Sequence, residues 1–284
     1  MSEAILEETI QEKEEKEAVV EGVSIYYIEN GQGFPTVLLH GWPTSSFLWR
    51  NVYPALAEQG KVIVPDLPGY GQSEKSIGIC YSINEQAERL GKFIEYLGFE
   101  KINLVVHDIG GTIGLLWAVR NADKINRLVI SDTIIFPELK GILLSMRLLI
   151  LFSRLPVIGN MFVTDFAIKN FMKLGVYGKS VLSREVLKNY IAPLGNKNGR
   201  RACLKSLSDI NMKECKEIIN KISLLKIPVK IVFGGKDFLM RKEMYRIKEL
   251  LPEAEFTIIK NAGHFLQEDE PGKLGKELKE FLFN

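Results

Sequence analysis

Residues 103–114 read Asn-Leu-Val-Val-His-Asp-Ile-Gly-Gly-Thr-Ile-Gly, an apolar run that meets one acidic residue and then a group of glycines. The apolar run predicts a strand buried on both faces, and the residues after it predict a helix. A tight strand-to-helix turn exposes the side chain at its apex, and glycines allow backbone segments to approach one another there. Asp108 occupies this apex and is therefore the first candidate for a reactive residue.

The position of Asp108 suits a nucleophile. The helix N-terminus behind it favours the ionised form of its carboxylate. A carboxylate nucleophile forms a covalent ester, which divides a difficult displacement into two easier steps. The alternative is that Asp108 only caps the helix, a role that aspartate fills well.

Short apolar runs alternate with amphipathic segments on both sides of this turn. The alternation predicts an α/β fold with a mostly parallel central sheet flanked by helices. The expected strands are Val23–Ile28, Thr36–His40, Lys61–Pro65, Ile102–His107, Ile125–Ser131, Val229–Phe233 and Glu255–Ile259. The expected helices are Ser45–Gln59, Ile83–Leu97, Gly110–Asn121, Arg241–Leu251 and Pro271–Phe283.

The alternation stops between about Phe136 and Met212, where the pattern is helical and contains no convincing strand. Because strands resume afterwards, we expect a core of residues 1–135 and 213–284 with an inserted helical cap, residues 136–212. The apolar stretch 141–159 is interrupted by Arg147, Arg154 and Pro156, well short of the roughly 20 apolar residues of a membrane span. We therefore expect a helix that covers an apolar pocket, and no membrane span.

Two more polar residues follow strands and are expected at the same edge of the sheet as Asp108. His264 lies in a glycine-containing loop after the last strand, and Asp237 follows the strand Val229–Phe233. The chain order nucleophile, acid, histidine favours His264 as the base and Asp237 as the acid that orients it. Asp132, after the strand Ile125–Ser131, is the alternative acid.

The segment 40–50, His-Gly-Trp-Pro-Thr-Ser-Ser-Phe-Leu-Trp-Arg, follows another strand. Its Gly-x-Pro turn can direct the backbone N–H of Trp42 toward the nucleophile, and the N–H of Ile109 would be the second donor. Two such donors form an oxyanion hole, each worth about 3–4 kcal/mol in acyl chemistry. The alternative is an ordinary strand-to-helix turn. His40 and His107, both beside turns, are expected to hydrogen-bond backbone groups.

The composition is that of a globular protein, with 46% hydrophobic residues and a formal net charge of +2. So small a charge predicts no nucleic-acid partner. Scattered cysteines outside any metal-ligand spacing predict reduced thiols, and the N-terminus has no signal-peptide pattern, so we expect a cytoplasmic protein. Glu7–Glu17 is expected to be a frayed helix or a solvated tail. The sequence leaves a homodimer open.

Together with Asp-Leu-Pro-Gly-Tyr-Gly-Gln-Ser at 66–73, these segments resemble the α/β-hydrolase superfamily from about Val23 onward. The motifs His-Gly-x-Pro-Thr-Ser-Ser-x-Leu-Trp-Arg and Leu-Val-Val-His-Asp resemble its branch of haloalkane dehalogenases and epoxide hydrolases. The resemblance implies the α/β-hydrolase fold, with Asp108 as nucleophile, His264 as water-activating base and Asp237 as its acid. It implies a small hydrophobic substrate and water as reactants, and no metal or organic cofactor.

Two departures from the dehalogenase pattern concern the leaving group. Dehalogenases carry tryptophan directly after the nucleophile, whereas Ile109 has no side-chain donor for a departing halide. Trp42 has an indole N–H, but the expected cap contains no tryptophan. Epoxide hydrolases protonate the ring oxygen with cap tyrosines, for which Tyr190 and Tyr177 are the candidates.

We therefore expect an epoxide hydrolase that acts on a hydrophobic epoxide. A haloalkane dehalogenase is the first alternative. A ligand receptor that kept the fold without turnover is the second. An esterase or lactonase is disfavoured, because carboxylate attack on the acyl carbon of an ester gives a mixed anhydride.

Overall fold

The computed structural model describes residues 13–138 and 163–284, and the strands in these residues form one eight-stranded sheet. The strand order is β1-β2-β4-β3-β5-β6-β7-β8. β1 pairs with β2, and β2 with β4, in antiparallel orientation, whereas every pair from β4 to β8 is parallel. The predicted, mostly parallel sheet is therefore confirmed.

Three of the predicted strands begin and end at the predicted residues, and the others shift by one or two. The strands are β1 Glu14–Val20, β2 Val23–Asn30, β3 Pro35–Leu39, β4 Lys61–Pro65, β5 Ile102–His107, β6 Ile125–Thr133, β7 Val229–Gly234 and β8 Glu255–Ile259. The α-helices are α1 Tyr53–Ala57, α2 Ile83–Tyr96, α3 Asp108–Arg120, α6 Asp165–Gly175, α7 Arg184–Ile191, α8 Lys197–Ser208, α9 Lys216–Lys221, α10 Arg241–Leu250, α11 Leu266–Asp269 and α12 Pro271–Phe283. The 3₁₀ helices are η1 Ser46–Trp49, η2 Ala122–Lys124, η4 Ala192–Leu194, η5 Met212–Cys215 and η6 Ile222–Leu224.

The expectation of a frayed helix or tail for Glu7–Glu17 is wrong from residue 14 onward, because β1 begins there. Glu21 and Gly22, with φ of +51° and +78°, form the two-residue turn that joins β1 to β2. Ala18 and Val20 are buried, whereas the residues before them are charged and mostly exposed. Pairing with β2 stabilises this strand, which has no continuous apolar face of its own. Its charged sequence therefore did not predict a strand.

The predicted single helix Ser45–Gln59 is also wrong, because the segment forms η1 and α1 instead. The hydroxyl of Ser45 accepts from the N–H of Phe47 and caps η1. Pro54 lies in the first turn of α1. Because proline has no N–H, it suits the first turn of a helix and not its interior, and a new helix begins there.

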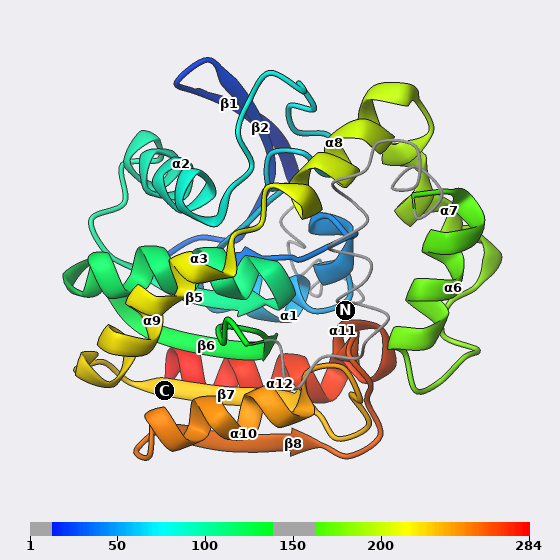
Figure 1. The fold of residues 1–284 in the computed structure, drawn as a ribbon. Coiled ribbons are helices and arrows are strands. Elements are labelled where there is room, and N and C mark those ends of the chain that lie inside the picture. Colours follow the sequence, from blue (N-terminus) through cyan, green and yellow to red (C-terminus); the bar gives the residue numbers. More distant parts are fainter. Residues whose placement is uncertain (1–12, 139–162) are drawn as a thin grey trace, which may run out of the picture.

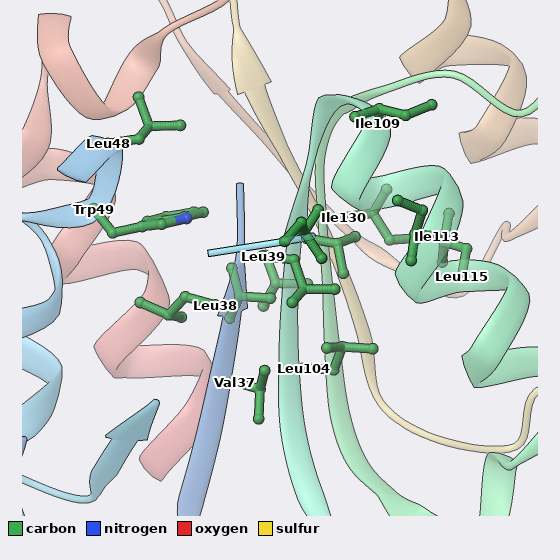
Figure 2. Packing of buried hydrophobic residues seen from close by; sticks show 14 of the residues in the cluster. Val37, Leu38, Leu39, Leu48, Trp49, Leu104, Ile109, Ile113, Leu115 and Ile130 are labelled. Atoms are coloured by element: carbon green, nitrogen blue, oxygen red, sulfur yellow. The ribbon is translucent and has the colours of Figure 1, made fainter. Parts of the chain in front are cut away.

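The core lies on both faces of the sheet. Figure 2 shows β3 side chains such as Leu38 between Trp49 on one side and α3 on the other, and all of these apolar side chains are buried. At Gly114, a Cβ would lie 2.6 Å from Cγ1 of Val106. The glycines that follow Asp108 therefore allow its helix to pack directly against β5.

The helices α6, α7 and α8, which we call the cap helices, lie between β6 and β7 in the chain and to one side of the sheet (Figure 1). Residues 163–212 contain helices and no strand. The boundaries of the cap at 136 and 212 stay a prediction, and the expected helix within 141–159 lies outside the described residues. In the parts of the chain that the structure describes, no helix has the length and apolar character to cross a membrane.

Candidate active site

Asp108 lies at the turn between β5 and α3. Its φ of +52° is in the left-handed region that residues other than glycine rarely occupy. The backbone passes close on two sides, since a Cβ on Gly41 would lie 2.2 Å from Oδ1 of Asp108 and a Cβ on Gly110 would lie 2.0 Å from the carbonyl oxygen of His40. The hydroxyl of Thr133 donates to the carbonyl of Asp108 over 2.6 Å. These contacts hold the carboxylate in one position.

Two backbone donors face the carboxylate of Asp108. The N–H of Trp42 donates to Oδ1 over 2.7 Å, and the backbone N–H of Ile109 also hydrogen-bonds the carboxylate. Burial acts to raise the pKa of Asp108, but His264, His107 and the Ile109 hydrogen bond outweigh burial and lower it below its ordinary value. Asp108 is therefore ionised at neutral pH, with two N–H groups directed at its oxygens.

His264 lies in the loop between β8 and α11 and faces two acids. Its Nδ1 is 3.0 Å from Oδ2 of Asp237, and its Nε2 is 3.4 Å from Oδ2 of Asp108. Only the Nδ1 contact is a hydrogen bond, and Nε2 has no hydrogen-bond partner within the described residues. Burial acts to lower the pKa of His264, but the two carboxylates raise it well above its ordinary value.

The carboxylate of Asp237 is bound by the main chain as well as by His264. Oδ1 of Asp237 accepts from the N–H of Leu239 over 2.7 Å and from the N–H of Met240 over 3.1 Å. Burial acts to raise the pKa of Asp237, but the charge and hydrogen bond of His264, with further hydrogen bonds, lower it. The structure thus brings Asp237 to His264, and its catalytic role stays a prediction.

Asp132, the alternative acid, ends β6 beside the same pair and is fully buried. Its Oδ1 accepts from the N–H of Gly234 over 3.3 Å. One ligand atom from each of Asp132, Asp237 and His264 lies within 4.8 Å of the other two.

The side chain of Trp42 contacts the cap helices. Its indole N–H donates to the carbonyl of Cys203 on α8 over 3.3 Å, and its ring packs edge-on against Phe171 of α6. The side chain of Ile109 has no polar atom. The backbone groups of these two residues therefore face the carboxylate, whereas the indole N–H that a departing halide would need is already used.

Neither predicted cap tyrosine hydrogen-bonds the carboxylate of Asp108 within the described residues. The hydroxyl of Tyr190, on α7, donates to Glu268, which also accepts from the guanidinium of Arg50 over 2.5 and 2.8 Å. Burial and the charge of Glu268 raise the pKa of Tyr190 well above its ordinary value. Tyr177 is 54% exposed. Their role as ring-opening acids stays a prediction.

Two buried residues beside the site were not predicted. Glu268 joins Arg50 of the segment 40–50 to the cap helix α7, and the only signal in the sequence is its place four residues after His264. Tyr70 lies in the loop after β4. Burial, Cys203 and the charge of Asp108 raise the pKa of Tyr70 well above its ordinary value.

The two remaining histidines hydrogen-bond backbone groups, as predicted. His40 accepts at Nε2 from the N–H of Leu67 over 2.9 Å, and its Nδ1 lies 3.0 Å from the carbonyl of Gly41. Nε2 of His107 lies 2.9 Å from the carbonyl oxygen of His264, and the two rings are 4.8 Å apart. Burial and the neighbouring His264 lower the pKa of His107 to about 4, so its ring is neutral.

Curated relatives match nearly the whole chain. A cis-3-alkyl-4-alkyloxetan-2-one decarboxylase of Shewanella oneidensis is 30% identical over 278 residues, 92% of this chain and 86% of the relative. A soluble epoxide hydrolase of Corynebacterium sp. strain C12 is 30% identical over 270 residues, 90% of this chain and 92% of the relative. The haloalkane dehalogenase 2 of Mycobacterium bovis is 28% identical over 268 residues, 90% of each.

Solved structures agree with these matches. An epoxide hydrolase superposes with a TM-score of 0.81 at 27% identity, over 95% of this chain and 98% of that chain. A haloalkane dehalogenase described as ancestral superposes with a TM-score of 0.84 at 25% identity, over 94% and 98%. The family described by the alpha/beta hydrolase fold matches residues 35–271. The chain therefore belongs to the α/β-hydrolase family, and epoxide hydrolases and haloalkane dehalogenases are among its relatives.

Proposed function

We propose that this protein is a hydrolase that forms a covalent alkyl ester on Asp108 and cleaves it with water activated by His264. The lead substrate class is a hydrophobic epoxide. The observation that carries the proposal is the position of one carboxylate, whose Oδ1 is 2.7 Å from the N–H of Trp42 and whose Oδ2 is 3.4 Å from Nε2 of His264. In this proposal Asp237 orients His264 through Nδ1.

In the first stage Asp108 attacks a ring carbon of the epoxide. A bond forms between that carbon and a carboxylate oxygen, the carbon–oxygen bond of the ring breaks, and the ring oxygen takes up a proton. The lowered pKa of Asp108 supports this stage, because the carboxylate is ionised and ready to react over the whole neutral range.

In the second stage His264 acts as a base. The charge of Asp108 helps to raise the pKa of His264 in the free enzyme, and formation of the ester removes that charge. The pKa of His264 then falls, and Nε2 can take a proton from water. The resulting hydroxide attacks the carbonyl carbon of the ester, and the oxyanion is stabilised by the N–H groups of Trp42 and Ile109. The bond between that carbon and the alkyl oxygen then breaks, and the alkyl oxygen takes the proton from His264 as the diol leaves.

The choice of leaving group rests on the available donors. A halide would need side-chain donors, yet Ile109 has none and the indole of Trp42 is bound to Cys203. An epoxide needs a proton for its ring oxygen. Residues 139–162 contain no tyrosine, tryptophan or histidine, so they do not add a donor of these types. Tyr70 and Tyr190 are the buried tyrosines of the described residues around the site.

A second candidate is a strained cyclic ester, an oxetan-2-one, as in the name of the Shewanella relative. The scarcity of donors favours it, because opening its alkyl carbon–oxygen bond releases a carboxylate, which needs neither a proton nor a halide pocket. Asp108 would again form an alkyl ester, and not the mixed anhydride of attack at the acyl carbon. Loss of CO₂ from the released carboxylate would then form a carbon–carbon double bond and expel Asp108 as a carboxylate.

The two candidates differ in their need for His264. Wild type, His264→Ala and Asp108→Asn are incubated separately with styrene oxide, 1-bromohexane and a cis-3,4-dialkyloxetan-2-one. If the protein is an epoxide hydrolase, the wild-type enzyme releases diol, whereas the His264→Ala variant accumulates the epoxide adduct. An oxetanone decarboxylase releases alkene and CO₂ in both, because expulsion of Asp108 requires no water. Bromide release by wild type, with no diol from the epoxide, would favour a dehalogenase instead. Turnover by Asp108→Asn of any substrate would contradict the proposal.

A further inference from the structure

Two buried carboxyl groups, Asp132 and Asp237, lie beside His264, although one acid is enough to orient a catalytic histidine. Asp132 ends β6 and Asp237 follows β7, and these strands are neighbours in the sheet. Both residues are at most 1% exposed. Asp132 has a φ of +36°, which is unusual for any residue except glycine. A buried acid in a disfavoured backbone conformation indicates that its side chain is held there by specific contacts.

The two acids have unequal sets of donors. Asp237 accepts from two backbone N–H groups at 2.7 and 3.1 Å and from Nδ1 of His264 at 3.0 Å. Asp132 receives one longer backbone contact, from Gly234 at 3.3 Å, and a contact from the hydroxyl of Ser131 at 3.1 Å. The surroundings therefore stabilise a negative charge on Asp237 better than on Asp132.

Two carboxyl groups this close and this buried do not both ionise. One atom of each lies within 4.8 Å of the other and of a ring nitrogen of His264. The charged groups that act on Asp132 are Asp237, which disfavours its ionisation, and His264, which favours it. Burial, then the charge and hydrogen bond of Asp237, raise the pKa of Asp132 well above its ordinary value, whereas the pKa of Asp237 is lowered.

We propose that Asp132 is a positioning residue of the site: a neutral carboxylic acid that donates a hydrogen bond to Asp237 and can replace it as the partner of His264. The expected changes in kcat rest on the proposed function, whereas the expected hydrogen bonds of Asp132 do not. In its first role Asp132 fixes the carboxylate that orients the base. In its second role it becomes the ionised group when Asp237 is neutralised, because the negative charge that opposed its ionisation is then gone.

The kinetic test uses Asp237→Asn, Asp132→Asn and the double variant, with an accepted substrate from the panel above. Loss of a triad carboxylate by Asp-to-Asn substitution costs about 10⁴ in kcat where no replacement exists. We expect Asp237→Asn to lose only roughly 10²-fold, and the double variant to lose about 10⁴. Equal rates for Asp237→Asn and the double variant would overturn the replacement role.

The first role is tested at position 132 alone. Asparagine keeps a side-chain donor, so Asp132→Asn should lose no more than about threefold in kcat, whereas Asp132→Ala leaves Asp237 without that donor and should lose at least roughly tenfold. Equal kcat values for the two variants would overturn this role. Thermal unfolding of both variants identifies the fraction of folded enzyme, to which each kcat is normalised.

A proton signal separates this inference from the proposed function. The hydrogen bond at Nδ1 of His264 places its proton in the far-downfield NMR range, and the signal is assigned by its absence from His264→Ala. We expect the signal to persist, shifted, in Asp237→Asn and to disappear in Asp132→Asn/Asp237→Asn. Its disappearance in Asp237→Asn alone would overturn the inference. Because no substrate is needed, this readout holds even if Asp108 is not a nucleophile.

Discussion

The carboxyl edge of the sheet and the cap helices contribute to the site in different ways. At the sheet edge, the backbone of Gly41 lies close to Asp108, the N–H of Trp42 donates to its carboxylate, and the hydroxyl of Thr133 donates to its carbonyl. From the cap helices, side chains and one carbonyl group contact the core: Tyr190 binds Glu268, and Cys203 accepts from Trp42. In the proposed function, the edge supplies the reacting groups, and the cap helices contribute to the choice of leaving group and substrate.

Substitution of the proposed nucleophile tests the sheet edge with the largest expected effect. Asp108→Asn keeps the size of the side chain and removes its nucleophilic oxygen. We expect kcat/KM to fall by at least about 10⁴, because the covalent stage is lost. Steady-state kinetics with the accepted substrate measure this, and intact mass confirms that residue 108 remains asparagine. A loss of less than tenfold would show that the edge does not supply the reacting group.

Gly110→Ala tests whether close backbone approach holds the turn. Its Cβ would lie 2.0 Å from the carbonyl oxygen of His40, so we expect unfolding free energy to fall by about 3 kcal/mol or more. Gly272→Ala is the matched control, because no atom lies within 4 Å of that Cβ on α12. Alanine in a helix is favoured over glycine by roughly 1 kcal/mol, so the control should gain stability. Chemical denaturation of both variants measures the difference.

The pH dependence tests the coupling between Asp108 and His264. The pKa of Asp108 lies below its ordinary value, so the first stage continues at pH 5. His264 must be neutral in the ester intermediate, where its pKa is lower than in the free enzyme because the charge of Asp108 is gone. Ester cleavage should therefore slow as the pH falls from 8 to 5, so the adduct should accumulate at pH 5 and disappear at pH 8. Equal amounts of adduct at both pH values would contradict this coupling.

Tyr190→Phe tests the cap with the smallest expected effect. Removal of a hydroxyl that binds Glu268 should lower the unfolding free energy by about 1–2 kcal/mol and kcat by less than tenfold, because Arg50 still pairs with Glu268. A loss of about 10² or more in kcat for the epoxide would instead identify Tyr190 as the ring-opening acid. Tyr177→Phe, at an exposed position, is the control for tyrosine substitution in the cap.

The sequence predicts the sheet edge far better than the cap, for physical reasons. Strands such as Ile102–His107 are buried on both faces, so apolar runs mark their ends. The strand Glu14–Val20 escaped prediction because its pairing with β2 stabilises it despite a charged sequence. The contact between Tyr190 and Glu268 joins residues 78 positions apart, and no local pattern reports such a contact.

Covalent capture on Asp108 tests the central claim most directly. His264→Ala is mixed with an epoxide in excess, and intact mass followed by peptide mapping locates any added mass. We predict stoichiometric addition of the substrate mass at Asp108 in this variant, with none in Asp108→Asn/His264→Ala. Diol formation at the wild-type rate by His264→Ala, with no adduct on Asp108, would contradict the account.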